Sequence, residues 1–237
     1  MKFSQPLISG TLLRRYKRFL LDVELAGGDI ITAHTANTGA MTGCSTPGSR
    51  VWLSRSPNPK RKYPLSWELV EVAPQVLCGI NTQLSNALVR EAIEAGQVAE
   101  LIGYSGIRSE VAYGNERSRI DLLLEASAPA DLPSCYVEVK NVTLVEDDVA
   151  YFPDAISARG SKHLRELMAM TAKGYRALIF YCVQREDCLE LRPADAIDAI
   201  YGQTLREALD AGVEALAYKA TVTIEGVELT ERLPVVV

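Results

Sequence analysis

The sequence predicts a two-domain protein of the α/β plus all-β class, with a small β-barrel over residues 1–80 followed by an α/β domain over residues 81–237. Short alternating apolar and polar segments separated by Gly and Pro fill the first domain, whereas helical periodicity begins just after it. The charge changes at the same point. Residues 1–80 hold ten basic and five acidic side chains, whereas the remainder holds 15 basic and 25 acidic ones. This asymmetry predicts two domains with different partners, the first suited to a polyanion.

The barrel is predicted from several short strands. Phe19, Leu21, Val23 and Leu25 alternate with polar or second-face residues, and Gly27-Gly28 supplies a tight turn into a further strand. The later strands are expected at residues 30–34, 51–53 and 67–72. Strands of this length with Gly and Pro turns are typical of a small barrel.

In the second domain, Asn81 or Thr82 is predicted to cap a helix that ends at Gly96, and Ser161 to cap a second helix that ends at Gly174. Between them lie three expected strands, and after them a buried apolar strand; these strands are residues 107–113, 118–125, 135–143 and 176–183. The pattern by itself predicts only an α/β domain.

Asp121 interrupts the apolar run of one expected strand, and Glu138 and Lys140 lie on the next strand. Alternation sends Val137 and Val139 into the core and the two charged side chains to the opposite face. A turn-rich connection over residues 126–134, which includes Pro129, lets the strands pair and brings Asp121 beside Glu138. Two carboxylates suit Mg²⁺, and a neighbouring ammonium suits the orientation of a water or the stabilisation of charge on a phosphoryl oxygen. The alternative is a set of cross-strand ion pairs on a solvated sheet face.

Asp121 with Glu138-Val139-Lys140 resembles the signature of the PD-(D/E)XK nuclease superfamily, with Ile120 where the superfamily name has proline. Over nearly its whole length the chain also resembles the sugar fermentation stimulation protein A (SfsA) family. The matching stretches are residues 12–20, 37–39, 110–111, 118–121, 136–144, 152–155 and 159–167.

The resemblance implies an N-terminal OB-like barrel joined to a PD-(D/E)XK nuclease-like domain, and sequence-independent DNA binding. Asp121, Glu138 and the Val139 carbonyl are then expected to hold Mg²⁺ (or Mn²⁺), and Lys140 to position the attacking water. An acid on the first helix often assists the metal in this superfamily, which makes Glu91 a candidate, with a solvated helix charge as the alternative. Two functions remain open: a nuclease that hydrolyses phosphodiesters, and a non-catalytic DNA-binding regulator of sugar (maltose) metabolism.

The segment Arg14, Arg15, Tyr16, Lys17 and Arg18 is the predicted DNA-binding site of the barrel, supported by a second basic cluster at residues 60–62. Alternation along a strand divides these side chains between two faces, with Arg14, Tyr16 and Arg18 on one of them. The alternative is a strand edge that its charges protect against aggregation. The small-residue segment 37–44 is expected to be an ordinary barrel loop rather than a ligand-binding one.

Arg159, Lys162 and His163 surround the N-terminus of the second expected helix, where exposed N–H groups favour a phosphate. For His163 the alternatives are a proton carrier and a packed or surface histidine.

The chain has neither an apolar run long enough for a membrane span nor the apolar core of a secretory signal, so a cytoplasmic location is expected. The five cysteines form no C-x-x-C pair and are expected to be buried thiols. No distinct carbohydrate-binding site is legible, and the sequence does not determine an oligomeric state.

Overall fold

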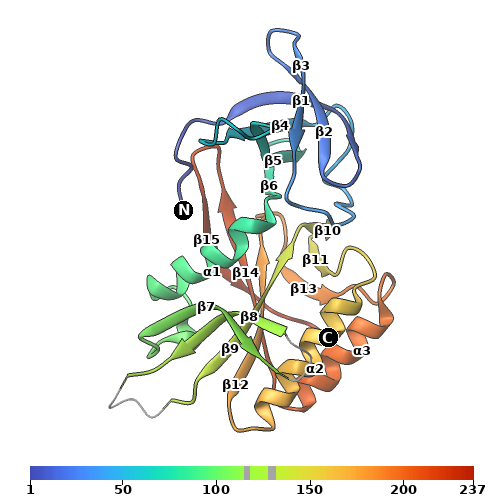
Figure 1. Ribbon diagram of the computed structural model, residues 1–237. Helices are drawn as coiled ribbons and strands as arrows, with labels where there is room; N and C mark the ends of the chain where they lie inside the picture. Colours follow the sequence, from blue (N-terminus) through green and yellow to red (C-terminus); the bar gives the residue numbers. More distant parts are fainter. Residues whose placement is uncertain (115–117, 128–131) are drawn as a thin grey trace.

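The computed structural model describes residues 1–114, 118–127 and 132–237, so the predicted turn at Pro129 lies outside the described residues. The first six strands build a barrel that stands on an α/β domain (Figure 1). They pair in the order β3-β2-β1-β4-β5-β6, and the bridge between His34 and Ser66 joins β3 to β5 and closes the barrel. The strands are β1 Ile8–Tyr16, β2 Leu20–Leu25, β3 Ile30–His34, β4 Arg50–Arg55, β5 Leu65–Ala73 and β6 Val76–Gly79.

The core of the barrel is formed by inward-facing side chains of alternating strand positions, including Leu12, Leu21, Val23 and Trp67, all fully buried. Leu21 and Val23 therefore face inward, as their alternation in the sequence predicts. Phe19 does not, because it precedes β2 and its side chain is 41% exposed.

The α/β domain is built around a mixed six-stranded sheet in the order β15-β14-β12-β9-β8-β7. Strands β9, β12 and β14 run parallel to one another, whereas β7, β8 and β15 join the edges in antiparallel pairings. A separate three-stranded sheet, β10-β11-β13, is not foreseen from the sequence. The strands are β7 Gly106–Tyr113, β8 Ser118–Glu125, β9 Cys135–Val142, β10 Leu144–Glu146, β11 Val149–Phe152, β12 Arg176–Val183, β13 Glu190–Pro193, β14 Glu214–Val222 and β15 Val227–Leu233.

Helices cover both faces of the large sheet (Figure 1). Helix α1 (Ser85–Glu94) packs with Val137 and Val139 on one face, whereas α2 (Ala158–Thr171) and α3 (Ala199–Asp210) pack on the other. Each face of β9 is therefore covered, so Glu138 and Lys140, which alternate with the two valines, lie on the α2 side of the sheet rather than in solvent. Short 3₁₀ turns at Thr82–Leu84 and Ala99–Leu101 flank α1.

The second long helix begins one turn earlier than the sequence predicts. The side-chain oxygen of Ser157, rather than that of Ser161, accepts the N–H of Gly160 and caps α2, while Ser161 lies buried inside the helix. Both serines fit a cap locally, and a tertiary contact holds Ser157 at the helix start, since its N–H donates to Asp198 Oδ2 at 2.7 Å. This shift places Arg159 in the first turn of α2.

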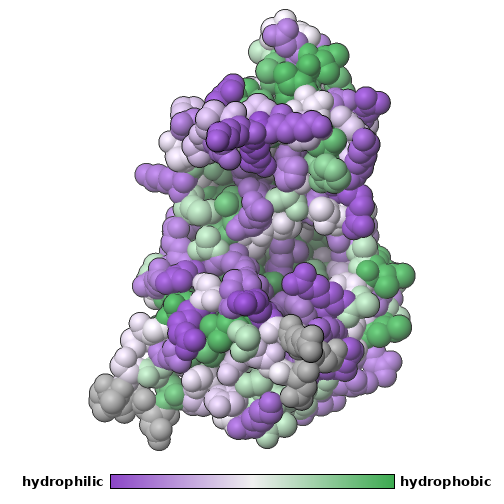
Figure 2. All heavy atoms as spheres, in the orientation of Figure 1, coloured by the Kyte–Doolittle hydropathy of each residue, from purple (hydrophilic) through white to green (hydrophobic). Residues whose placement is uncertain are grey.

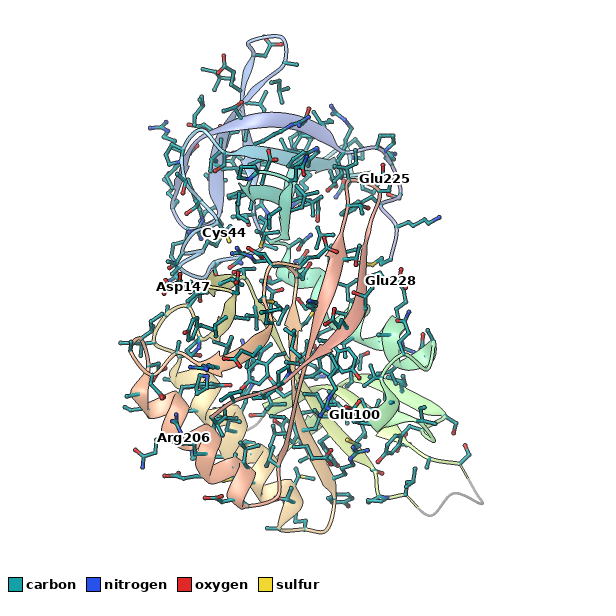
Figure 3. All side chains as sticks on the ribbon, turned by 180° about the vertical axis from the view of Figure 1, so that it is seen from behind. Cys44, Glu100, Asp147, Arg206, Glu225 and Glu228 are labelled. Atoms are coloured by element: carbon teal, nitrogen blue, oxygen red, sulfur yellow. The ribbon has the colours of Figure 1, made fainter. Side chains whose placement is uncertain are left out.

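The two domains meet through specific contacts between their loops and strand ends. The N–H of Gly79 donates to the carbonyl of Gln184 at 2.9 Å, and Cys44 Sγ lies 3.6 Å from the carbonyl oxygen of Thr143. Figure 3 shows Cys44 at the base of the barrel and Asp147 just across the junction. The barrel is thus held against the carboxyl ends of the parallel strands, where α/β proteins commonly place their sites.

All five cysteines are buried free thiols, as expected from their spacing. Within the described parts of the chain, no helix is both long and apolar enough to cross a membrane.

Candidate functional site

Asp121 and Glu138 meet where strands β8 and β9 separate. Only Leu122–Leu124 of β8 pair with Cys135–Val137 of β9. Asp121 and Glu138 are the residues just beyond the same end of this paired segment. Asp121 Oδ2 accepts the Val139 N–H at 2.7 Å, so the carboxylate satisfies a backbone donor that the shortened ladder leaves without a strand partner. This hydrogen bond fixes Asp121 against the residue that follows Glu138.

An irregularity in the neighbouring strands orients Asp121. Ile120 packs into the hydrophobic cluster beneath α2, whereas Leu122 packs into the cluster beneath α1, so the regular alternation of β8 changes at Asp121. The facing residue on β7, Glu110, has φ +56°, and its carbonyl accepts the Arg119 guanidinium at 2.6 Å. A non-glycine residue in this backbone region is uncommon and marks a local departure from sheet geometry.

Glu138 is buried, with only 2% of its surface exposed. Its Oε1 accepts the Lys140 ammonium at 2.6 Å and also contacts His163 Nδ1. Its Oε2 is buried and has no hydrogen-bond partner among the described residues. A buried carboxylate oxygen without a donor is costly, so this atom is suited to a ligand that supplies positive charge.

His163 links this cluster to the surface. The Arg159 Nε–H donates to His163 Nε2 at 3.3 Å, so Nε2 is the accepting nitrogen and Nδ1 carries the hydrogen toward Glu138. Arg159 is exposed at the start of α2, and Lys162 is half-buried on the same helix. Of the three candidates on this helix, His163 therefore lies in the cluster itself and Arg159 at its edge.

The two carboxylates have opposite pKa shifts. Burial, followed by the negative charge of Glu138, raises the pKa of Asp121, although the Val139 N–H and the Asn86 amide partly oppose this. Burial also acts to raise the pKa of Glu138, but hydrogen bonds from His163 and Lys140 outweigh it and leave the pKa lowered. Ionised Asp121 is therefore the less stable of the two charges.

The residue of α1 that reaches the cluster is Asn86, not Glu91. Asn86 Nδ2 donates to Asp121 Oδ1 at 2.8 Å. The Glu91 carboxylate is 54% exposed and instead accepts the N-terminal ammonium of Met1 at 2.8 Å. The candidacy of Glu91 is corrected on this ground: its position on the helix turns it toward the N-terminal segment, and an amide supplies the contact.

Tyr113 is a second residue that the sequence does not indicate. Its hydroxyl is buried and lacks a partner within the described part of the chain. Burial, together with the charges of Glu138, Glu166 and Asp121, raises the pKa of Tyr113, which places its hydroxyl close to the acids. A neutral hydroxyl here can donate a hydrogen bond to an oxygen ligand in the cluster.

The donor set at this site fits a hard divalent cation. No group of three or more His, Cys, Asp and Glu side chains in the described ranges is arranged to hold a metal. Two carboxylates suffice for Mg²⁺, because it keeps water in its remaining positions. Asp121 retains lone pairs beyond its two hydrogen bonds, and Glu138 Oε2 has no other partner in the described chain. Ion pairs on a solvated sheet face, the alternative to a metal site, do not describe this cluster because Glu138 is buried.

The basic segment of the barrel is not one regular strand. β1 has a register shift between Leu12 and Arg14 and ends at Tyr16, and Lys17 and Arg18 form a turn with φ +50° and +65°. Arg14 and Tyr16 share one face as predicted, since both side chains reach Asp22. The predicted alternation fails at Arg18, which the turn takes off the strand.

Most of these side chains bind other parts of the barrel. Arg14 pairs with Asp22 at 2.8 Å, and the Tyr16 hydroxyl lies 3.1 Å from the same carboxylate. Arg15 is half-buried, and Arg18 donates twice to the Thr38 carbonyl. The Arg15 guanidinium donates to four carbonyls, those of Arg18, Asn37, Gly39 and Ala40. Arg15 and Arg18 therefore shape the loop that follows β3. Lys17, by contrast, is exposed at the turn.

The comparisons with known proteins cover both domains. The model of the SfsA N-terminal OB domain matches residues 13–80, and that of the sugar fermentation stimulation protein RE domain matches residues 83–226. The chain belongs to the SfsA family.

Sugar fermentation stimulation protein homologs of this family match over almost the full chain. One from Geobacter metallireducens is 61% identical over 236 residues, with 100% of both chains covered, and one from Pseudomonas aeruginosa is 54% identical, with 99% of each covered. The structure of Pyrococcus furiosus SfsA in complex with Ca²⁺ is 28% identical, covers 100% of this chain and 98% of its own, and has a TM-score of 0.89. The predicted OB barrel followed by an α/β domain is confirmed.

In this SfsA-family chain, Arg15→Ala is expected to lower the free energy of unfolding by about 2–4 kcal/mol, because four carbonyls lose a charged donor. Arg14→Ala is the matched control and should cost clearly less than Arg15→Ala, because the Arg14 side chain is 69% exposed and water screens its ion pair. Urea unfolding followed by tryptophan fluorescence measures both, since Trp52 and Trp67 lie in the barrel. Equal losses would contradict the assignment of Arg15 to the loop.

Replacement of the two acids by their amides should change stability in opposite directions. A raised folded-state pKa means that ionised Asp121 destabilises the fold at neutral pH, so Asp121→Asn should raise the melting temperature there, and the gain should fade as the pH drops through that pKa. Glu138→Gln removes a stabilising charge from Lys140 and should cost about 3–5 kcal/mol at neutral pH.

Because the pKa of Glu138 is lowered, its contribution is present above the unfolded-state pKa and is lost as the pH falls. The deficit of Glu138→Gln should therefore also shrink on acidification. Thermal unfolding across this pH range tests the pair. A lower melting temperature for Asp121→Asn at neutral pH would contradict the interpretation.

Proposed function

We propose that this SfsA-family protein is a sequence-independent DNA-binding protein with a PD-(D/E)XK nuclease-like core, and that it hydrolyses phosphodiesters with Mg²⁺ or Mn²⁺. The observation that carries the proposal is the buried Glu138 Oε2, which has no partner in the described chain and lies beside Asp121 and Lys140. The ion pair between Glu138 and Lys140 does not explain why Glu138 Oε2 is buried without a hydrogen-bond donor among the residues that the structure describes.

Each residue of the cluster has a distinct role in this proposal. Asp121, Glu138 and the Val139 carbonyl would hold the cation, which when bound supplies an activated water and neutralises charge on the phosphate. Lys140 has an ammonium with three donors, of which Glu138 uses one, so it can also orient a water or a phosphate oxygen. The Arg159–His163 pair holds Glu138 Oε1, which leaves Oε2 for the metal.

The Ca²⁺ complex of the Pyrococcus furiosus relative supports a site for a hard cation in this family. Ca²⁺ and Mg²⁺ both take oxygen ligands, but Ca²⁺ accepts longer and more flexible coordination. A carboxylate pair with open water positions therefore suits either ion.

For the barrel, the exposed basic side chains are the proposed contacts with the DNA backbone. Lys17 and Arg14 are exposed at the β1–β2 hairpin, and Arg61 and Lys62 lie on the β4–β5 loop. Arg61 contacts His34 Nδ1 at 3.3 Å, which adds an aromatic ring to this basic surface. Contacts of this kind recognise phosphate and base faces rather than base sequence.

A second candidate function follows from a different observation. Lys140 and His163 already surround Glu138 Oε1, so the cluster is partly compensated by the chain's own residues. That compensation favours a stable scaffold without catalysis, and hence a DNA-binding regulator of sugar (maltose) metabolism. The two candidates differ in whether Lys140 has a chemical task.

Calorimetric titration of Mg²⁺ into the wild type should give a saturable heat that Asp121→Ala abolishes, because one of two carboxylate ligands is lost. Glu91→Ala is the matched control, since Glu91 binds the N-terminus and should leave the heat unchanged. Equal heats for the wild type and Asp121→Ala would remove the metal site.

Nicked, linear and single-stranded DNA and RNA, incubated with Mg²⁺ or Mn²⁺, should include at least one substrate that the wild type cleaves. Lys140→Ala is expected to slow that cleavage by about 100-fold or more, the scale of losing one preorganised electrostatic donor. Lys173→Ala, at an exposed position just beyond the end of α2, is the control for loss of positive charge. If the wild type leaves every substrate intact, the scaffold function is favoured instead.

A further inference from the structure

A cavity of about 180 Å³ lies between the barrel and the α/β domain, and we refer to it as the interdomain pocket. On the face seen in Figure 2 the surface is hollowed at this junction. Six of the residues that line the pocket carry the inference: Asn37, Thr82, Asn141, Tyr151, Phe152 and Asp154. They come from the loop after β3, the start of the second domain, the end of β9, and β11 with the turn that follows it.

The wall contributed by the barrel is fixed in place. Arg15 holds the carbonyls of Asn37 and Gly39, and Asp154 Oδ2 accepts the N–H of Met41 at 2.9 Å across the domain junction. A Cβ on Gly39 would lie 3.0 Å from oxygens of both Asn37 and Asp154, so the loop approaches this turn closely. The segment predicted to be an ordinary barrel loop is thus a preformed wall of a pocket.

The polar groups of the pocket face it with definite hydrogen-bonding character. The oxygen of Asn37 accepts the Gly39 N–H, and that of Asn141 accepts Ser85 and Gln184, so each amide NH₂ is the group left over. Asp154 and Tyr151 line the same pocket and add a carboxylate and a hydroxyl to the two amides. The pocket therefore offers donors together with one anionic acceptor.

An aromatic ring completes the lining. Phe152 is partly exposed and is held by Tyr181 and Tyr201, with ring centroids 5.6 and 5.1 Å away. Tyr201 meets the Phe152 ring edge-on and Tyr181 meets it at a tilt, and part of the Phe152 surface remains available to the pocket.

We propose that the interdomain pocket receives one nucleobase of a single-stranded nucleic acid whose adjacent phosphate lies at Lys140. A space of 180 Å³ is smaller than the roughly 300–1,000 Å³ of pockets for drug-sized ligands, so its occupant is a single small group. A base supplies a flat face for Phe152 and an edge of donors and acceptors for the two amides and Asp154. This inference rests on the proposed function and names its substrate class.

The position and burial of the catalytic cluster favour a single strand. Val142 lines the pocket and lies two residues beyond Lys140 on β9, a separation of about 7 Å along a strand. The side chains of Glu138 and Lys140 are only 3% and 12% exposed, so the phosphate must enter a recessed site. A single strand can bend into such a recess, whereas a duplex would have to open first.

Asp154 gives the pocket a base preference. A carboxylate accepts hydrogen bonds and repels carbonyl oxygens, so a base with an exocyclic amine, such as cytosine, is favoured over thymine. Asp154→Asn keeps an oxygen for the Met41 N–H but loses the charge, and should reduce the preference.

The test is fluorescence anisotropy of short single-stranded oligonucleotides bound to the 237-residue chain in Ca²⁺, with one abasic site moved along the strand. Removal of the base at one position should weaken binding about 5- to 150-fold, the value of a stacked base, while the other positions change little. Thr82→Phe fills the pocket from its wall. It should weaken binding of the intact strand by the same factor as removal of the sensitive base, and should leave binding of the strand that lacks this base unchanged.

Two further variants test the inference independently of Thr82→Phe, in case that variant does not fold. Asp154→Asn should reduce the preference for cytosine over thymine at the sensitive position, and Asp147→Asn, an exposed acid on the β10–β11 turn that does not line the pocket, should not. An equal effect at every abasic position, or an unchanged scan in Thr82→Phe, would overturn the inference.

Two other results would overturn it for different reasons. Wild-type protein that binds no oligonucleotide would remove the proposed function itself, and the inference with it. A flat abasic scan combined with calorimetric binding of glucose that Thr82→Phe abolishes would assign the pocket to a sugar instead.

Discussion

The burial of Glu138 is the constraint on which the rest of the α/β domain depends. A carboxylate with 2% exposure is stable only if positive charge or hydrogen-bond donors surround it. Lys140 supplies one donor from the same face of β9, and His163 supplies another from α2. The start of α2 at Ser157 therefore matters, because it positions the Arg159–His163 pair over the strand. What these residues leave unsatisfied, Glu138 Oε2, is what makes the cluster a candidate for a cation.

A second constraint acts at the junction of the domains. Arg15 and Arg18 donate hydrogen bonds to backbone carbonyls of the loop after β3. That loop in turn donates the Met41 N–H to Asp154 in the other domain. The barrel is thus connected to β11 a few residues from the start of α2. Arg15 and Arg18, which the sequence suggests as DNA contacts, therefore have a structural role. The interdomain pocket that they help to form lies at the end of β9, the strand of Glu138 and Lys140.

Both constraints connect stability with function. Asp121 is costly to ionise where it lies, and such a group is typically retained because a ligand needs it. The β8–β9 separation that exposes the Val139 N–H to Asp121 also interrupts the sheet at the place where a cation and a phosphate would need room. A continuous ladder would have been more regular, but it would leave no space between the two acids.

The sequence by itself determined most of the barrel and large-sheet strands, although not the β10-β11-β13 sheet or the start of α2. Alternation placed Val137 and Val139 in the core, and apolar runs located strand 176–183 to the residue, because such patterns act over neighbouring positions. It also supplied Asp121, Glu138 and Lys140 as candidates. Only the tertiary structure decided which charged side chains are buried and which residues they contact. Asn86 rather than Glu91 reaches Asp121. Arg15 turns toward the loop after β3, and His163 contacts Glu138. These contacts join residues far apart in the chain, and local periodicity contains no information about them.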